Sequence, residues 1–450
     1  MEPVEQQVQS ESTASESSSE HSSASPVRTE RRRKPRTWET PPAPVPPTRL
    51  DDYKSIVGVA ELDELKYLAR DLKGKTVKMV NSTAVGGGVA EMLNQMVPLL
   101  NEVEVNTHWD VITGGNDFFE VTKAFHNALQ GSEYNLTQQA RDIFLMHNEQ
   151  NRQRIQFSED FLVIHDPQPA ALIRARQKES QQRWIWRCHI DLSNPNRQVW
   201  DFLRPFIEQY DAAIFSSQSF SRQLQIPQYL FYPCIDPLSE KNKDLDESFI
   251  QQVCDEFGVD RSRPIVTQVS RFDRAKDPVG VVQAFKQARK YVDCQLVLAG
   301  GGASDDPEGA AVLKEVKEAA GDDRDIIVLD LPPWCALEIN ALQRASTIVV
   351  QKSIREGFGL TVTEALWKGK PTIAGAVGGI PNQIIHKLTG ALVHSVDGCA
   401  YQMRYLLTHP DFAKQLGQNG REHVKENFLM TTNVRRWLLL LRILLAGTAK

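Results

Sequence analysis

The chain has 450 residues, of which 41% are hydrophobic and 24% are charged, and this composition excludes a fibrous or wholly disordered protein. At about 100–200 residues per domain, the length predicts two or three domains, each with a hydrophobic core. The 52 Lys and Arg residues against 57 Asp and Glu residues give a net charge of −5, which disfavours nucleic acid as the main partner.

Cysteine usage and hydropathy favour a cytoplasmic protein. The six cysteines contain no CxxC pair, so neither a zinc knuckle nor a redox dithiol is predicted, and reduced thiols are expected. The longest apolar run, 437–446, is interrupted by Arg442 and is shorter than the roughly 20 residues of a bilayer span. The N-terminus is rich in Ser and Glu and does not resemble a secretory signal, so no membrane partner is expected.

Residues 1–50 are predicted to be a disordered tail. The segment is rich in Ser and Glu, then basic, and then rich in Pro from Pro41 to Pro47, with almost no large aliphatic residues. Its basic block is either a solvated run of charge, which we favour, or a docking site for an acidic partner.

From Thr76 onwards, short apolar runs alternate with amphipathic stretches, which is typical of a parallel sheet buried between helices. The predicted strands are 76–80, 109–112, 161–164, 184–186 and 212–215, and the predicted helices with clear bounds are 89–100 and 119–129. A break rich in Pro, Asp and Lys, from Pro233 to Asp246, marks the end of a first domain predicted at 51–235.

The same alternation restarts in a second domain, predicted at 236–430. Strands are expected at 265–269, 295–299, 326–329 and 348–350, and helices at 279–290, 309–320 and 361–368. The two arrays predict an α/β protein with two Rossmann-like, doubly wound parallel sheets that face a cleft, because ligands bind at the carboxyl ends of such strands. An apolar helix at 431–447 is predicted to pack back on the first domain.

Three familiar motifs are excluded. Gly74-Lys75-Thr76 precedes its strand and has Ala69 where a P-loop needs glycine. The triple glycine 86–88 opens a helix, but Glu91 replaces the third glycine of a dinucleotide fingerprint, which disfavours a nicotinamide cofactor. The aspartate pairs Asp305-Asp306 and Asp322-Asp323 have no histidine or further carboxylate at the spacing of metal ligands, so no metal site is predicted.

The triple glycine is nevertheless a candidate binding element. Main-chain amides at a helix start attract anions or oxygen-rich ligands, and glycine lets a substrate approach the backbone closely. The alternative is a tight strand-to-helix turn. Three adjacent glycines are more than such a turn needs, so ligand contact is favoured.

Two basic side chains follow strand 265–269 of the second domain. Arg271 and Lys276 are candidates for a clamp on a diphosphate leaving group, in which one supplies a guanidinium fork and the other a point charge. The alternative is a pair of solvated cations.

Glu356 and Glu364 are eight residues apart, across a glycine-containing loop and the start of a helix. This spacing places Glu356 in the loop and Glu364 on the first turns of the helix, whose amides can bind phosphate. Glu364 alone has the alternative role of an ordinary acid near a helix start, where it balances the helix dipole.

The motifs together carry a family resemblance. Arg271-Phe272, Lys276-Asp277-Pro278, Glu356-x7-Glu364 and Gly378-Gly379-Ile380-Pro381 resemble, in order and spacing, the retaining glycosyltransferase family of sucrose and glycogen synthases, which implies the GT-B fold. Segments 81–91, 118–127, 165–168 and 186–191 resemble the trehalose glycosyltransferring synthases and their relative, trehalose phosphorylase. The resemblance covers residues 50–445.

The resemblance implies roles for the second-domain residues. Arg271 and Lys276 would hold the diphosphate of a nucleotide sugar, Glu364 would bond its ribose hydroxyls, and Glu356 would contact the transferred glucose near its reacting face. The catalytic residues are therefore expected to be Glu356, Arg271 and Lys276. The loop between the two glutamates is expected to bind substrate through Gly357, Phe358, Gly359 and Leu360.

The resemblance also implies that the first domain binds sugar. Gly87 and Gly88 would lie against the sugars, and a further set at strand ends would bind glucosyl hydroxyls, namely His165, Asp166, Arg187, His189 and Asp191. For each histidine the alternative is a buried, hydrogen-bonded core residue. Binding is favoured for His165, which adjoins Asp166 at a strand end, and both readings stay open for His189.

The implied activity is reversible formation of trehalose, with retention, from a nucleoside-diphosphate glucose and glucose. We expect same-face transfer, in which the diphosphate helps to deprotonate the acceptor, rather than a covalent glycosyl-enzyme. No protein-bound cofactor is expected, while Mg²⁺ that accompanies the nucleotide diphosphate and a homodimer are left open. The alternatives are a trehalose phosphorylase, although family phosphorylases are usually much longer chains, and a catalytically silent sugar-nucleotide sensor.

Overall fold

Six parallel strands form the sheet of the first domain, in the order β2-β1-β3-β4-β5-β6. The computed structural model describes residues 48–84, 88–301 and 307–447. Strands β3 and β5 are buried along their whole length, which explains why their sequences are continuous apolar runs rather than alternating ones. The strands are β1 (Thr76–Asn81), β2 (Asn106–Val111), β3 (Phe161–His165), β4 (Arg183–Arg187), β5 (Ala212–Phe215) and β6 (Gln228–Leu230).

Helices connect the strands of this sheet, since parallel strands need a crossover of a dozen or more residues. The α-helices of the first domain are α1 (Lys54–Val57), α2 (Val59–Ala69), α3 (Gly88–Glu102), α4 (Asn116–Leu129), α5 (Gln138–Arg154) and α6 (Arg197–Ile207). Short 3₁₀ turns accompany them at η1 (Leu50–Tyr53), η2 (Arg70–Leu72), η3 (Ala170–Ala175) and η4 (Gln218–Phe220).

The second domain repeats the architecture with six parallel strands in the order β12-β11-β10-β7-β8-β9. Its strands are β7 (Ile265–Val269), β8 (Gln295–Gly300), β9 (Ile326–Asp330), β10 (Ile348–Gln351), β11 (Thr372–Gly375) and β12 (Ala391–Val393). Its helices and turns are α7 (Glu247–Phe257), η5 (Arg274–Lys276), α8 (Pro278–Ala288), α9 (Pro307–Ala320), α10 (Ala336–Ala345), α11 (Leu360–Trp367), η6 (Ile380–Asn382), α12 (Val396–Thr408) and α13 (Pro410–Asn427). The prediction of two doubly wound parallel sheets is confirmed.

The strand order reverses once in each sheet, and the two reversals position the candidate site. In the first sheet β1 lies between β2 and β3, and in the second sheet β7 lies between β10 and β8. Ligands of doubly wound folds bind at such switch points, outside the carboxyl ends of the strands. The chain segments that follow β1, β3, β7 and β10 are therefore where substrate contacts are expected.

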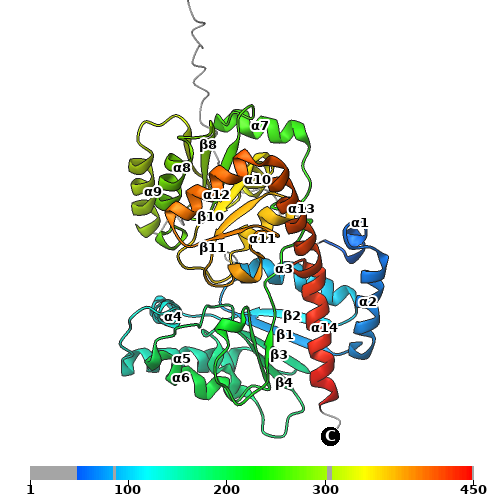
Figure 1. Cartoon of the computed structure of the whole chain (residues 1–450). Coiled ribbons are helices and arrows are strands. Elements are labelled where there is room, and N and C mark those ends of the chain that lie inside the picture. The colour runs from blue at the N-terminus through cyan, green and yellow to red at the C-terminus, as the bar shows by residue number, and fades with distance from the viewer. Residues whose placement is uncertain (1–47, 85–87, 302–306, 448–450) are drawn as a thin grey trace, which may run out of the picture. The chain divides into compact units, whose positions relative to one another are not determined.

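The last helix, α14 (Met430–Ala446), returns to the first domain (Figure 1). It lies beside α2 and α3, and Trp437 and Leu438 are buried in the same apolar cluster as Leu93 and Met96 of α3. Ion pairs join Arg435 to α2, at 3.2 Å from Glu61 and 3.1 Å from Glu64.

The two crossings between the domains pass side by side. Ile235 on the outgoing segment pairs with Leu429 on the returning one in a parallel bridge. Its amide donates to the Phe428 carbonyl at 2.9 Å, and the Met430 amide donates to its carbonyl at 2.9 Å. The two crossings therefore form a hinge whose segments are joined by backbone hydrogen bonds at this single bridge.

The predicted tail falls almost entirely on residues 1–47, which lie outside the described residues. Leu50, the last residue of that prediction, is 1% exposed and begins η1 in the core cluster of the first domain. The domain boundaries at 235 and 430 stay predictions, although the chain does leave the first sheet after β6 and reach α7 through the segment where the break is predicted.

Candidate active site

An ion pair between Lys276 and Glu356 lies at the second-domain switch point. Lys276 follows β7 and Glu356 follows β10, and Nζ lies 2.6 Å from Oε2. The two side chains are 17% and 10% exposed, respectively. Ser353 Oγ also donates to Glu356 Oε2 at 3.2 Å. A cation and a carboxylate are thus held together at the point where a sugar donor is expected.

Local structure before α8 explains where Lys276 points. Asp277 adopts a left-handed backbone with φ +50°, and its Oδ1 accepts from the Gly280 amide at 3.1 Å, which caps the helix that Pro278 begins. Its other oxygen pairs with the buried ammonium of Lys352. The carbonyl of Lys276 accepts from Gln268 Nε2 at 2.9 Å. This bond and the two contacts of Asp277 fix the backbone at Lys276.

Arg271 occupies a different environment from Lys276. Its side chain is 64% exposed, and Nη2 lies 3.1 Å from Asp273 Oδ2. It lines a cleft of about 880 Å³ between the two domains, and among the described residues of its lining are four cationic side chains and two carboxylates. The residues of that cleft are Ser82, Phe119, Thr122, Lys123, His126, Asn127, Gln130, Ser132, Gln168, Arg271, Phe272, Asp273, Arg274, Ala275, Glu308, Ile354 and Arg355. Arg271 and Arg274 are each paired with a carboxylate, Asp273 and Glu315 respectively, and Lys123 and Arg355 supply further positive charge that suits a diphosphate.

The glycine loop between the two glutamates is tightly packed. A Cβ on Gly378 would lie 1.7 Å from the Glu356 carbonyl oxygen, so the predicted Gly-Gly-Ile-Pro segment forms the floor of this loop. Gly359 has φ +86°, a conformation that favours glycine. Phe358 is 6% exposed and packs on Tyr232 and Phe428, so its ring anchors the loop.

Two of the predicted substrate contacts meet across the domain interface. A Cβ on Gly88, at the start of α3, would lie 3.4 Å from Leu360 Cδ1, at the start of α11. A Cβ on Gly357 would lie 3.8 Å from the His189 carbonyl. The glycine segments of the two domains therefore approach each other, as the predicted cleft requires. Gly87 lies outside the described residues.

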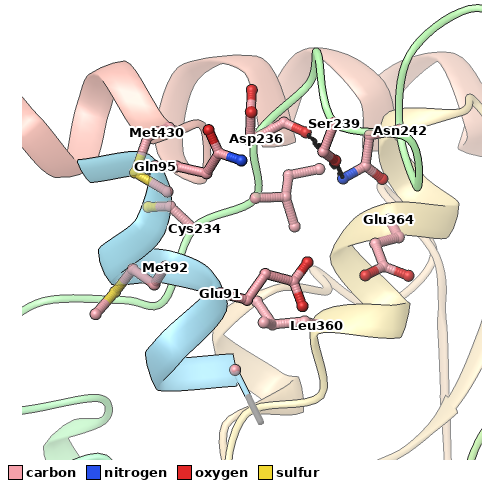
Figure 2. Close-up of a pocket in the computed structure, with 12 residues that line it drawn as sticks. Glu91, Met92, Gln95, Cys234, Asp236, Ser239, Asn242, Leu360, Glu364 and Met430 are labelled. Atoms are coloured by element: carbon pink, nitrogen blue, oxygen red, sulfur yellow. Dashed lines mark hydrogen bonds between the residues drawn. The ribbon is translucent and has the colours of Figure 1, made fainter. Parts of the chain in front are cut away.

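Glu364 lies in a small cavity shared by both domains (Figure 2). Its carboxylate and that of Glu91 on α3 both point into this space, whose volume is about 20 Å³, enough for about one water. Lys241 Nζ lies 2.7 Å from Glu91 Oε2, and the charges of Glu364 and Glu91 raise the pKa of Lys241 against the opposing effect of burial. A ribose requires more room than this cavity offers, so its binding at Glu364 requires Gly88 and Leu360 to separate.

On the first domain, His165 and His189 form a stacked pair at the ends of β3 and β4. Nδ1 of His165 lies 3.0 Å from Nε2 of His189, and the ring planes differ by 10°. Burial lowers the pKa of His165 to about 3 and, with the Arg187 charge acting in the same direction, lowers the pKa of His189 far below its usual value. Both rings are therefore neutral at pH 7, and His165 Nε2 has no hydrogen-bond partner among the described residues.

Asp166 holds the end of β3 in an unusual turn. Its φ is +65°, and its Oδ1 accepts from the His189 amide at 2.7 Å. Burial raises the pKa of Asp166 to about 6, although the hydrogen bond to the His189 amide and the charge of Arg187 oppose the shift. Asp166 thus fixes the backbone that carries His189.

Arg187 and Asp191 are bonded to their own domain. Arg187 is 2% exposed, and its guanidinium donates to Ser216 Oγ at 3.0 Å and to the Phe231 carbonyl at 2.8 Å. Burial lowers its pKa to about 10. Asp191 Oδ1 accepts from the Ser193 amide at 2.8 Å. In this arrangement Arg187 supports the ends of β4 and β5 from within the domain.

Several contacts at the site were not among the sequence predictions. Ser353 bonds Glu356, Lys352 pairs with Asp277, and Lys241 pairs with Glu91. Asn382 Nδ2 donates to Ser217 Oγ at 3.0 Å and so links the Gly-Gly-Ile-Pro segment to the first domain. The strand-end position of Lys352 and Ser353, directly after β10, is the sequence signal that could have identified them.

Comparison with known proteins identifies both halves of the chain. Residues 79–222 match the model of the trehalose synthase N-terminal domain, and residues 252–423 match that of glycosyl transferases group 1. The trehalose synthase of Thermococcus litoralis is 47% identical over 399 residues, which cover 87% of this chain and 96% of that protein. The chain belongs to the trehalose synthase family. It is a glycosyltransferase, as the sequence resemblance indicates.

More distant similarities concern a longer relative and the fold. A trehalose phosphorylase of Pleurotus pulmonarius is 30% identical over 446 residues, which cover 87% of this chain but 60% of that protein. The sucrose-phosphate synthase of Thermosynechococcus elongatus is similar in structure, with a TM-score of 0.62 and 17% identity over 83% of this chain and 100% of that one. The GT-B fold is thereby confirmed. In the described part of the chain, no helix is both long and apolar enough to cross a membrane.

Proposed function

We propose that this trehalose synthase relative is a retaining glucosyltransferase that forms trehalose reversibly from a nucleoside-diphosphate glucose and glucose. The observation that carries the proposal is the 2.6 Å pair of Lys276 and Glu356 at the second-domain switch point, in a chain 47% identical to a trehalose synthase. The proposal assigns the donor to the second domain and the acceptor to the first.

The donor half rests on charge. As the glycosidic bond of the donor breaks, negative charge grows on the departing diphosphate while the anomeric carbon becomes oxocarbenium-like. Lys276 and the exposed Arg271 supply positive charge for that oxygen, and Glu356 lies beside Lys276 where the sugar would be held. Closure of the two domains over the donor would exclude the water that could otherwise hydrolyse it.

The acceptor half rests on neutral hydrogen-bonding groups. The stacked His165–His189 pair offers uncharged ring nitrogens, and one of them, His165 Nε2, lacks a partner within the described residues. Sugar hydroxyls can both donate and accept, so they suit such groups better than a charged ligand does. For deprotonation of the acceptor we favour the departing diphosphate, which keeps the transfer on one face of the sugar.

The proposal includes no protein-bound cofactor, and Mg²⁺ enters only with the nucleotide diphosphate. A cytoplasmic location is supported by the six cysteines, which are all buried thiols. Dialysis against EDTA should leave the melting temperature unchanged. A marked fall would indicate a resident metal and contradict this part of the proposal.

The deciding experiment is incubation of the full chain with trehalose and, in separate reactions, ADP, UDP, GDP or phosphate. The expected products with at least one nucleoside diphosphate are the nucleoside-diphosphate glucose and free glucose, with the α-configuration retained by NMR. Equal or faster glucose release with phosphate alone would identify a phosphorylase. No product under any condition, from a folded protein that binds nucleotide, would identify a silent sensor.

The assignment of donor and acceptor to different domains has its own test. His165→Ala should raise the KM for glucose, because an unpaired buried polar partner costs about 1–3 kcal/mol, while calorimetric affinity for the nucleoside diphosphate stays near that of the wild type. Asp166→Ala should behave in the same way. Loss of nucleotide affinity with normal glucose kinetics would contradict the assignment.

A further inference from the structure

A second cavity lies apart from the residues assigned above to donor and acceptor. Its volume is about 840 Å³, within the range of small-molecule sites. It is lined by α1, by the segment that leaves the first domain, and by α11 and α13 of the second domain. The lining residues are Ser55, Ile56, Pro237, Leu238, Asn242, Lys243, Asp244, Trp367, Gln418, Asn419, Arg421, Glu422 and Lys425.

Three cations in this lining have no carboxylate partner. Within the described ranges, Lys243, Arg421 and Lys425 form no ion pair, and the guanidinium of Arg421 instead lies 5.0 Å from the ring centre of Trp367. Of the two acidic side chains in the lining, Asp244 is already paired with Arg344 at 2.9 Å. The cavity therefore has an uncompensated positive charge.

Two further cations of the second domain bond the segment that lines the cavity. Arg344 on α10 donates to the Asn242 and Lys243 carbonyls, and Lys368, directly after α11, donates to Asn242 Oδ1 at 3.1 Å. Burial lowers the pKa of Lys368 to about 7; the charge of Glu364 opposes this shift, and the charge of Arg344 adds to it. Burial lowers the pKa of Lys370 to about 8, again with Arg344 contributing.

The neutral part of the lining suits hydroxyl groups. Gln418 and Ser55 are exposed at the cavity and have polar side chains that make no hydrogen bond within the described residues. The space is also far larger than a bare phosphate requires. We propose that this cavity binds a phosphorylated sugar, with the phosphoryl group at Lys243, Arg421 and Lys425 and the sugar hydroxyls toward Gln418 and Ser55.

Such a ligand would act on the hinge. The cavity contains residues of both domains and of the connecting segment, and Asn242 lines this cavity and the small Glu364 cavity alike. A ligand that contacts Lys243 holds that segment in the position seen here, in which Glu364 has room for about one water. Binding should therefore weaken the affinity for the nucleoside diphosphate, and by reciprocity the nucleotide should weaken the affinity for the sugar phosphate.

Calorimetry on the full chain tests the site without turnover, so its outcome is independent of the proposed reaction. Glucose 6-phosphate should bind, and the double variant Arg421→Ala/Lys425→Ala should bind it at least about ten-fold more weakly, as should Lys243→Ala. The control is Lys414→Ala, an exposed lysine on α13 outside the lining, which should keep wild-type affinity. All variants should keep the wild-type melting temperature and basal transferase activity.

Binding of inorganic phosphate and of glucose, and binding of glucose 6-phosphate to Lys276→Ala, can each contradict the proposal. Inorganic phosphate that binds as tightly as glucose 6-phosphate would show that the sugar is not recognised, and glucose that binds equally well would show that the phosphate is not. If Lys276→Ala abolishes binding and the Arg421→Ala/Lys425→Ala variant does not, the ligand occupies the active-site cleft. No binding at millimolar concentration overturns the site altogether.

Discussion

Lys276 and Glu356 neutralise each other while no substrate is present, at 2.6 Å and largely shielded from water. A diphosphate that enters the site competes with Glu356 for the ammonium group. The pair therefore holds a positive charge in place at the site, and neither partner is left buried and unpaired. In the proposed reaction this charge becomes available where the leaving group departs.

Lys276→Ala should lower kcat/KM by about 2–4 kcal/mol of transition-state stabilisation, or roughly 30- to 1,000-fold, because one preorganised charge is lost. Arg271→Ala should have an effect in the same range. Lys314→Ala, on the exposed face of α9, is the matched control and should retain full activity. Unchanged turnover in both Lys276→Ala and Arg271→Ala, with folding intact, would exclude a role for the clamp.

Acid should destabilise the protein through His165. Its folded pKa of about 3 is below the unfolded value near 6.5, so the unfolded chain binds more protons between these limits. The stability that depends on the neutral ring is present above about pH 6.5 and is lost toward pH 3, at about 1.4 kcal/mol per pH unit. Asp166 acts in the opposite direction below pH 6, because its folded pKa is raised to about 6.

His165→Gln should therefore lose about 2 kcal/mol less stability than the wild type between pH 6.5 and pH 5, measured by urea unfolding. The exposed His108 on β2 provides the control variant, His108→Gln, which should follow the wild-type pH profile. Parallel profiles for His165→Gln and the wild type would show that His165 is not neutral in the folded state.

Part of the site could be predicted from the sequence because strand ends are visible in it. Arg271 and Glu356 follow recognisable apolar strands, and the topology of doubly wound sheets brings such ends together. The contacts that hold the site together could not be predicted from the sequence. Lys352 and Asp277 are 75 residues apart, and only the packed fold brings them into contact. The hydrogen bonds from the buried Arg187 guanidinium to Ser216 and to the Phe231 carbonyl likewise join residues that are distant in the sequence.

At the scale of elements, α14 completes the core of the first domain. Trp437 is 1% exposed and meets Phe231 edge-to-face at 5.4 Å between ring centres. The helix thus supplies apolar surface that α2, α3 and the strands beneath them would otherwise expose to water.

Trp437→Ala should lower the free energy of unfolding by about 3–5 kcal/mol, because it leaves a cavity in a packed cluster. Scanning calorimetry should show a clear fall in melting temperature. Leu439→Ala on the same helix removes a side chain that is 42% exposed, and its effect should stay within about 0.5 kcal/mol. Similar losses for both variants would mean that α14 does not contribute to this core.

Strands were easier to predict than helices in this chain, for a physical reason. Buried parallel strands such as β7 are uninterrupted apolar runs, and its predicted bounds match those observed. The first half of β2 is polar and partly exposed at the sheet edge, so the predicted strand began at 109 rather than at Asn106. Helix α5 is so polar along its length that periodicity alone gave it no bounds.

At the scale of the whole molecule, the tail is expected to be dispensable. Deletion of residues 1–47 should leave the melting temperature and glucosyl transfer unchanged, because this segment lacks the apolar residues needed to join a core. A deletion of residues 1–53 is the informative comparison, since it also removes the buried Leu50 and Tyr53 and should destabilise the protein. Equal loss of stability in the two deletions would assign a structural role to the tail.

The return of α14 across the hinge also determines the order in which the protein can mature during synthesis. At about 5–20 residues per second, a ribosome needs roughly 10–40 s to pass from Ile235 to Met430, and during that time the first domain lacks Trp437. The second domain is contiguous in sequence and can close its own core first. The first domain, although synthesised earlier, must wait with part of its apolar surface uncovered, which makes it the half of the nascent chain that is exposed to chaperones and to aggregation.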